Sequence, residues 1–350
     1  MKKLLFVAVL LVGSGVYSTC ALAQTDAGLL YLMIKPGARA AGSGEAFVAT
    51  ADDATATYYN PGGLAFQTGK ALSMSHTKWL PALANDLYHE FLAYSWHQEG
   101  LGHLGMYIIY MSYGQQVRMS ETAEFLGTFR SFDTALGLSY GARLSDRSSV
   151  GVTIKILHSR LSPKGTAAEK GPGSGTSCAV DLGYLHRDLF TQGFSFGVNL
   201  QNVGPSITYI DAGQADPLPQ NLKVGFAYQI FQSEFNSLKL SADFSKLLVR
   251  RTKDNKTDPF YKALVTSWTD KKLKTEINEV ITNVGLEYWY GSWVSLRTGL
   301  NRDTYFGEGK AYVTFGAGLK YRMLQFDMAY MPAPKTPLAN NTRFSLTVRL

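Results

Sequence analysis

Cysteine and long apolar runs are both scarce in this 350-residue chain. The two cysteines are Cys20 and Cys178, and Cys20 lies in an N-terminal stretch that we expect to be removed. The mature chain would then keep one cysteine and no internal disulfide, so its sheet must hold the fold together. After residue 23 no segment offers about 18 consecutive uncharged apolar residues, which excludes membrane-spanning helices. A β-barrel is not excluded, because half of each of its strands faces a polar interior.

Catalytic and metal-binding motifs are also missing. The six histidines show no HExxH spacing, no GxSxG elbow is present, and the glycine-rich stretch 171–177 lacks the lysine of a phosphate loop. Asp52 and Asp53 lack the spacing of a calcium loop. We therefore predict no catalytic site, no metal and no cofactor. The formal charge falls from +7 to +5 without Lys2 and Lys3 and forms no basic stripe, so nucleic acid is not an expected partner.

What the chain has in abundance is alternation of apolar and polar residues. In the stretch 311–322 every second residue from Ala311 to Tyr321 is apolar, and the intervening positions are mostly glycine, threonine or charged residues. The same split recurs at 222–230 and 194–200. A period of two predicts strands with one apolar face.

Fourteen such segments follow one another from residue 70 to the end. The predicted strands are 70–79, 89–98, 101–112, 132–143, 148–161, 176–187, 193–202, 220–230, 237–247, 281–290, 293–302, 310–322, 324–331 and 342–350. The long connectors between them are 80–88, 113–131, 162–175, 203–219, 248–280, 303–309 and 332–341, and each alternates with a tight one. This layout is typical of bacterial outer-membrane barrels, whose short turns face the periplasm. We therefore predict an all-β, 14-stranded antiparallel transmembrane β-barrel over 70–350, in outer-membrane lipid, with extracellular long loops and periplasmic termini.

A soluble β-sandwich or secreted barrel would also alternate, but two features favour the membrane. Aromatic residues gather near predicted strand ends, as an interfacial girdle requires, namely at Trp79, Trp96, Trp289, Tyr290 and Trp293. The last strand places Phe344, Leu346, Val348 and Leu350 at a spacing of two up to the terminus. That spacing is typical of barrel-assembly signals, although such signals usually end in an aromatic residue.

Two segments precede the strands. Residues 1–23 have the layout of a cleavable secretory signal, with a basic start, the apolar run 4–12 and a closing Ala21-Leu22-Ala23. Residues 24–69 do not alternate and are rich in glycine and alanine. We predict that they form an N-terminal plug segment, which starts on the periplasmic side and tucks into the lumen, where small residues allow close packing.

The longest connector, 248–280, is the best candidate for a functional loop. Asp258-Pro259 predicts the start of a helix. An aromatic and aliphatic stripe then falls at helical spacing, made of Phe260, Tyr261, Leu264, Val265 and Trp268. Two interpretations are open: the stripe binds a partner, or it packs down on the barrel rim as a lid. On the polar faces of the strands, charges of both signs predict pairing across the lumen rather than an ion-selective pore.

The segment from Gly37 to Phe66 resembles the N-terminal signature of the PorV/PorQ family of outer-membrane proteins, distant relatives of FadL-type fatty-acid channels. The matching residues are Arg39, Gly42, Gly44, Asp52, Asp53, Asn60, Pro61 and Leu64. Ser43 and Gly62 stand where Met and Ala are common. Later stretches, including 216–222, 285–290, 315–321 and 337–344, are also similar to the family. After Val249 the chain continues with Arg250-Arg251 in place of the family's usual proline-rich stretch.

The resemblance implies a role in type IX secretion of Bacteroidetes-type bacteria. Such barrels accept the folded C-terminal signal domain of a secreted cargo protein as it leaves a very large translocon barrel. They pass the cargo to a cell-surface attachment complex that contains a sortase-like protease. The alternative function is a FadL-like conduit for hydrophobic compounds, gated by the plug. A membrane-embedded hydrolase would need a Ser-His or Asp-His cluster, which the sequence does not present, so we expect a non-enzymatic protein.

Overall fold

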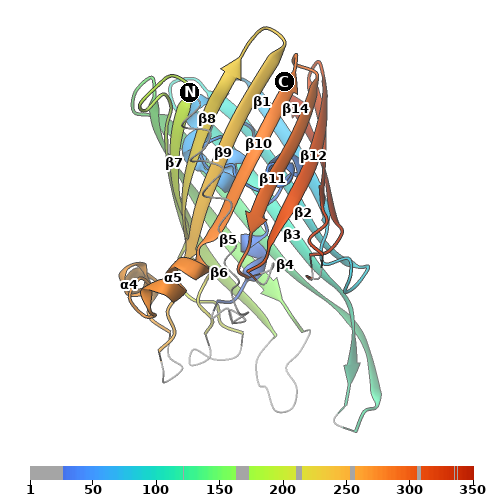
Figure 1. The fold of residues 1–350 in the computed structure, drawn as a ribbon. Coiled ribbons are helices and arrows are strands. Elements are labelled where there is room, and N and C mark those ends of the chain that lie inside the picture. Colours follow the sequence, from blue (N-terminus) through green and yellow to red (C-terminus); the bar gives the residue numbers. More distant parts are fainter. Residues whose placement is uncertain are drawn as a thin grey trace.

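The computed structural model describes residues 27–120, 122–162, 173–209, 215–252, 257–305, 309–334, 336 and 338–350. The expected signal peptide, 1–23, lies outside these described residues. Within them, fourteen antiparallel strands form a closed barrel (Figure 1). The strands are β1 (Lys70–Lys78), β2 (Leu87–Gln98), β3 (Gly102–Met119), β4 (Phe125–Arg143), β5 (Ser148–Arg160), β6 (Ser174–His186), β7 (Phe194–Val203), β8 (Asn221–Gln232), β9 (Asn236–Leu247), β10 (Ile281–Tyr290), β11 (Val294–Arg302), β12 (Ala311–Tyr321), β13 (Leu324–Met331) and β14 (Asn341–Arg349).

Each strand pairs with its neighbours along the chain, and β1 closes the barrel on β14. The closing pairs run from Ala71↔Arg349 to Thr77↔Arg343. The wall therefore has no free edge, which removes the usual risk of edge-to-edge aggregation. This architecture confirms the predicted fold class.

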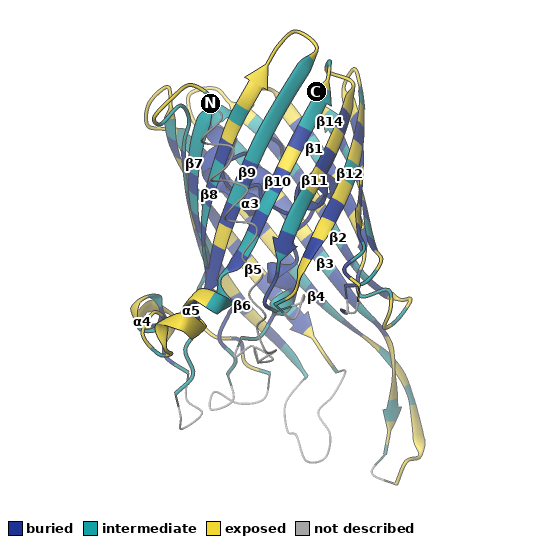
Figure 2. Ribbon diagram, in the orientation of Figure 1, coloured by how far each residue is buried: buried dark blue, intermediate teal, exposed yellow. Residues whose placement is uncertain are grey.

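Burial alternates along the strands with the period that the sequence predicts, as the coloured bands of Figure 2 show. In β13 the side chains of Gln325 and Asp327 are buried, whereas Leu324, Phe326 and Met328 are 46%, 47% and 42% exposed. An apolar side chain that points away from the lumen is covered by lipid when the barrel stands in a membrane. The outer wall is thus a lipid-facing surface.

The connectors define two rims. The tight turns after the even-numbered strands β2 to β12 form the short-turn rim, and the remaining connectors form the long-loop rim. Predicted strand ends lie within two residues of the observed ones, with one exception. The predicted connector 113–131 is wrong: β3 and β4 continue through most of it as a paired hairpin. Its apolar residues, Val117, Met119 and Phe125 among them, are interrupted by glycine and polar residues, so no continuous apolar face indicates strands there.

Trp79 does not join an interfacial girdle as predicted. Its side chain is only 5% exposed and packs in the luminal core. Trp79 follows Ser75 and Thr77 at a spacing of two, and both of these side chains are buried on the inward face of the wall. The Trp79 side chain therefore points inward as well.

The N-terminal segment 27–69 lies inside the barrel (Figures 1 and 2). It contains η1 (Leu30–Met33), α2 (Ala38–Gly42), α3 (Ala56–Tyr59) and η2 (Pro61–Phe66). Tyr58 and Tyr59 are almost fully buried and share one apolar cluster with Phe91, Tyr107 and Ile109 of the wall. The main core of the protein is therefore the contact between this segment and the inner face of the strands.

The expectation that the segment starts at the short-turn rim is wrong for the described residues. Gly28 N donates to Pro217 O over 2.9 Å, in the connector between β7 and β8. Met33 packs on Leu247 and Ile281, also at the long-loop rim. Burial of these apolar side chains holds the start of the segment there, while β14 ends at the short-turn rim. The two ends of the described chain thus lie at opposite rims, not at the same one.

Two short helices, α4 (Phe260–Thr266) and α5 (Leu273–Glu279), stand in the connector between β9 and β10. They project sideways from the long-loop rim (Figure 1). In the part of the chain that is described, no helix has the length and apolar character needed to span a bilayer.

Candidate functional site

The signature residues predicted for the N-terminal segment meet the wall through a buried ion cluster. Arg39, in α2, donates from Nε and Nη2 to the two carboxylate oxygens of Glu287 on β10, both over 2.9 Å. Its Nη1 donates to Asp53 over 3.0 Å and also to Asp52. On the other side, Arg297 Nε donates to Glu287 over 2.7 Å. A bidentate arginine–carboxylate pair is among the stronger polar contacts in proteins, so this cluster fixes α2 to the wall.

A second ion cluster lies further along the lumen. Glu45 accepts from Lys35 over 3.1 Å and from Arg343 of β14 over 2.8 Å. Within the wall, Lys155 and Asp181 stand 2.6 Å apart. Charges of opposite sign therefore pair in the lumen, as the mixed signs on the polar faces predicted.

The two predicted glycines mark the closest approach of the segment to the wall. A Cβ atom on Gly42 would lie 2.8 Å from Gly316 Cα. Gly44 has a φ of 63°, and a Cβ there would overlap Val284 O and lie 3.0 Å from Leu300 O. Both positions need glycine, Gly44 for its backbone conformation as well as for space.

Asn60 and Pro61 fix the end of the segment. Asn60 Nδ2 donates to Val48 O over 3.0 Å and to Tyr184 O over 2.9 Å. Its Oδ1 accepts from Gly62 N, which caps η2, and Pro61 takes the first position of that helix. Asp243 of β9 is one of the charged residues expected on the polar strand faces, but its contact with the segment was not predicted. Its Oδ2 accepts from the backbone N–H groups of residues 47 and 48 over 2.7 and 3.0 Å.

The lumen beside the Arg39 cluster holds little space. The cavity there, lined by Arg39, Asp53 and Asp327 among others, measures about 10 Å³, which is about the room for one water molecule. A larger hollow of about 390 Å³ is lined mainly by outward-facing side chains such as Met74, Leu92 and Phe344, and so lies on the outer wall. Across the described residues, no group of three or more His, Cys, Asp or Glu side chains is placed to hold a metal ion.

The predicted stripe of loop 248–280 is largely exposed. Phe260, Tyr261 and Trp268 are 40%, 66% and 46% exposed, and Leu264 is partly buried. The buried residue of α4 is the small Ala263. The stripe therefore does not pack down as the lid interpretation requires. The helix begins at Phe260, with Pro259 as its N-cap residue.

Sequence reasoning missed α5, which extends the exposed apolar surface with Leu273 (76%) and Ile277 (60%). Its buried residue, Glu276, bonds to Lys246 at the end of β9. Partial burial and the neighbouring Glu276 carboxylate raise the pKa of Asp270 to about 6. Burial acts to raise the pKa of Glu276, but Lys246 and Asp270 hold it below the usual value.

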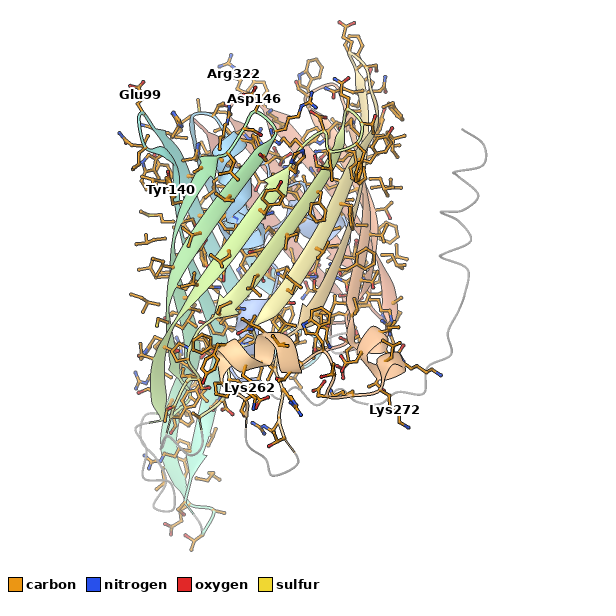
Figure 3. The ribbon with its side chains drawn as sticks, turned by 90° about the vertical axis from the view of Figure 1, so that its left-hand side faces the viewer. Glu99, Tyr140, Asp146, Lys262, Lys272 and Arg322 are labelled. Carbon is orange, nitrogen blue, oxygen red and sulfur yellow. The ribbon has the colours of Figure 1, made fainter. Side chains whose placement is uncertain are left out.

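Lysines flank the same surface. Figure 3 places Lys262 and Lys272 at the end of the barrel opposite to Glu99, Asp146 and Arg322. We name as the long-loop patch the exposed side chains of Tyr261 and Val265 on α4, Trp268 in the turn that follows, and Leu273 and Ile277 on α5. Its aromatic and aliphatic side chains can bury against a partner, and its lysines favour one that carries negative charge.

The predicted C-terminal assembly strand is β14. Phe344 and Leu346 point outward, and Phe344 stacks on Phe326 with ring centroids 6.2 Å apart. Leu350 and Lys70 exchange backbone hydrogen bonds of 2.8 and 3.2 Å, which completes the seam at the short-turn rim. Val348 follows Leu346 at a spacing of two and lies on the same outward face of β14.

Comparison with known proteins agrees with this architecture. The toluene transporter TbuX of Ralstonia pickettii is similar at 13% identity and a TM-score of 0.52, covering 90% of this chain and 98% of that one. The toluene transporter TodX of Pseudomonas putida is similar at 11% identity and a TM-score of 0.51, covering 88% and 95%. A FadL homologue of Pseudomonas aeruginosa is similar at 12% identity and a TM-score of 0.52, covering 89% of this chain and 97% of that one. At such identities the likeness is one of fold.

The family comparison is more specific. No curated protein sequence matches the chain. The family model for the type IX secretion system protein PorV matches residues 22–254, which is more than half of the chain. This range includes the N-terminal segment and the wall up to β9. The chain therefore belongs to the PorV family of type IX secretion system proteins, as an outer-membrane β-barrel with a FadL-like fold.

Proposed function

We propose that this barrel binds the folded C-terminal signal domain of a secreted cargo protein at its long-loop rim. It carries the cargo from the translocon barrel to the sortase-like attachment complex at the cell surface. The protein acts by binding and makes or breaks no covalent bond. The long-loop rim faces the cell exterior and the short-turn rim faces the periplasm, as in other bacterial barrels.

The observation that carries this proposal is the long-loop patch. Tyr261, Val265 and Leu273 are 66%, 73% and 76% exposed although they are apolar or aromatic. Large apolar side chains exposed at a rim suit an interaction site, and aromatic residues are enriched where partners bind. Lipid covers the outer wall of the barrel, whereas this patch stands on helices that project from the rim (Figure 1).

The occupied lumen supports binding at the rim over passage through the barrel. The ion cluster of Arg39 joins the segment to the wall, and the cavity that Arg39 lines measures about 10 Å³. A conduit for hydrophobic compounds needs an apolar path, and buried paired charges make such a path costly. Uptake of a labelled fatty acid by cells with and without the protein separates the two functions, and we expect equal uptake.

Retention on an immobilised cargo signal domain tests the proposal. The detergent-solubilised protein should be retained, and a variant with Tyr261→Ser, Val265→Ser, Leu273→Ser and Ile277→Ser should bind at least about tenfold more weakly, a loss of about 1.4 kcal/mol. The matched control replaces exposed apolar residues of the short-turn rim, Leu144→Ser, Phe190→Ser and Phe235→Ser. Equal retention of both variants would show that the patch is not the binding site.

A further inference from the structure

The hairpin formed by β3 and β4 extends well beyond the rest of the long-loop rim. The two strands are 18 and 19 residues long, the longest among the described strands. The pairing of β2 with β3 ends at Leu87↔Tyr113, and that of β5 with β4 ends at Phe132↔Arg160. Past these points β3 and β4 pair only with each other, from Gln115↔Arg130 onward. Figure 1 shows this hairpin reaching past the other connectors.

The β3 side of this extension is an open sheet edge. At about 3.4 Å per residue, the six steps from Tyr113 to Met119 reach about 20 Å beyond the wall. Gln115 N donates to the Asp86 carboxylate over 2.8 Å, which closes the edge at its base. Beyond it, no strand of the described residues flanks β3 on the side away from β4. Every second N–H and C=O of this stretch therefore points away from the hairpin, available to another chain.

The side chains of the extension indicate what kind of strand would fit. Val117, Met119 and Phe125 are 59%, 54% and 66% exposed. A two-stranded ribbon is at best marginally stable alone in water, so a third strand that covers these groups would stabilise it. The paired stretches 115–119 and 125–130 carry Arg118 and Arg130 and no acidic residue. The complementary strand is therefore one that combines apolar residues with Asp or Glu.

We propose that the exposed edge of β3, residues 116–119, accepts an edge strand from the β-rich signal domain of the cargo and so extends the sheet of that domain. Backbone hydrogen bonds supply affinity that does not depend on the exact cargo sequence, and Arg118 and Arg130 favour a strand with acidic side chains. One edge could thus serve many cargo proteins. This inference rests on the proposed function, because its partner is the same signal domain.

Single proline substitutions test strand addition. Proline has no N–H and bars a neighbouring strand, and successive residues of a strand point their N–H groups to opposite sides. Of the variants Gln116→Pro and Val117→Pro, one removes the N–H that faces the open edge and the other breaks a bond to β4. The control variants are Thr122→Pro at the hairpin tip and Val117→Thr, which keeps every backbone group. Folding of each variant is checked by the heat-dependent mobility of the barrel in detergent gels.

Affinity for a recombinant cargo signal domain and amide hydrogen exchange are then measured together. The proposal predicts that cargo protects amides within 116–119 from exchange, that the proline variant facing the edge loses at least tenfold in affinity, and that both controls stay within threefold. Unchanged affinity of both proline variants, with wild-type binding intact, would overturn strand addition and leave the proposed function standing. Absence of binding by the wild-type protein would overturn both.

Discussion

Arg39 and Glu287 are joined by two hydrogen bonds of 2.9 Å although 248 positions separate them in the chain. The pair ties α2 of the N-terminal segment to β10 of the wall. Asp52 and Asp53 share the same guanidinium, so one side chain organises the turn of the segment and its attachment. This contact fixes the N-terminal segment to the inner face of the wall.

Replacement of Arg39 should release the segment. Arg39→Met leaves the buried carboxylate of Glu287 with one cationic partner fewer, and breaking such a pair costs about 3–5 kcal/mol. We expect the variant to unfold at lower denaturant concentration and to conduct ions in planar bilayers. Arg322→Met, on the exposed short-turn rim, is the control and should change stability by less than about 0.5 kcal/mol. If Arg39→Met is as stable as the wild-type protein and conducts no ions, the ion cluster does not hold the segment in place.

Gly44 should tolerate no side chain. Gly44→Ala adds a methyl group that overlaps Val284 O and forces a positive φ on alanine, which together cost about 2–4 kcal/mol. Gly291→Ala is the matched control, because its φ of 57° is similar but nothing lies within 4 Å of the added Cβ. It should cost about 1 kcal/mol. Urea titration of the refolded proteins in lipid vesicles measures both, and equal losses would remove close packing as the cause.

A charged side chain on the outer face of β14 should destabilise the barrel more the deeper it lies in the membrane. Leu346→Lys places an ammonium group in the middle of the strand and should cost about 2–4 kcal/mol, whereas Leu350→Lys at the rim should cost about 0–1 kcal/mol. Leu350 is 68% exposed and stands at the end of the seam. The same vesicle titration applies. Similar costs at both positions would mean that Leu346 does not face the hydrocarbon.

The α4–α5 connector should become more ordered as pH falls. The pKa of Asp270 is raised from its ordinary value of 3.8 to about 6, first by burial and then by Glu276. A raised acid pKa means that the folded connector binds the proton more tightly than the unfolded one. The stabilisation is therefore fully present below about 4 and is lost as pH rises through about 6. Amide exchange of residues 267–280, corrected for the intrinsic pH dependence, should slow between pH 7.5 and 5. In Asp270→Asn this slowing of amide exchange between pH 7.5 and 5 should be absent. If it persists, a group other than Asp270 causes it.

The barrel wall was predictable from the sequence. The hairpin beyond the wall and the contacts of the N-terminal segment were less predictable. Period-two alternation is a local property, so it located the strands of the wall. It failed at 113–131, because that hairpin extends beyond the wall and its exposed apolar residues, such as Val117 and Met119, form no continuous apolar face. The family resemblance indicated Arg39 and Asp53, but a partner as distant as Glu287 has no local signal. Backbone N–H groups bonded by Asp243 leave no trace in residue type, so that contact could not be predicted either.

Cross-linking in living cells tests whether cargo binds at the long-loop rim. A photoreactive amino acid placed at Val265, which is 73% exposed in the long-loop patch, is compared with the same amino acid at Phe190, which is 85% exposed on the short-turn rim. Cells that secrete cargo are irradiated, and the adducts are identified by mass spectrometry. If cargo binds at the long-loop rim, adducts with its C-terminal signal domain form from position 265 and none form from position 190. Cargo adducts from position 190 alone, or from neither position, would contradict binding at that rim.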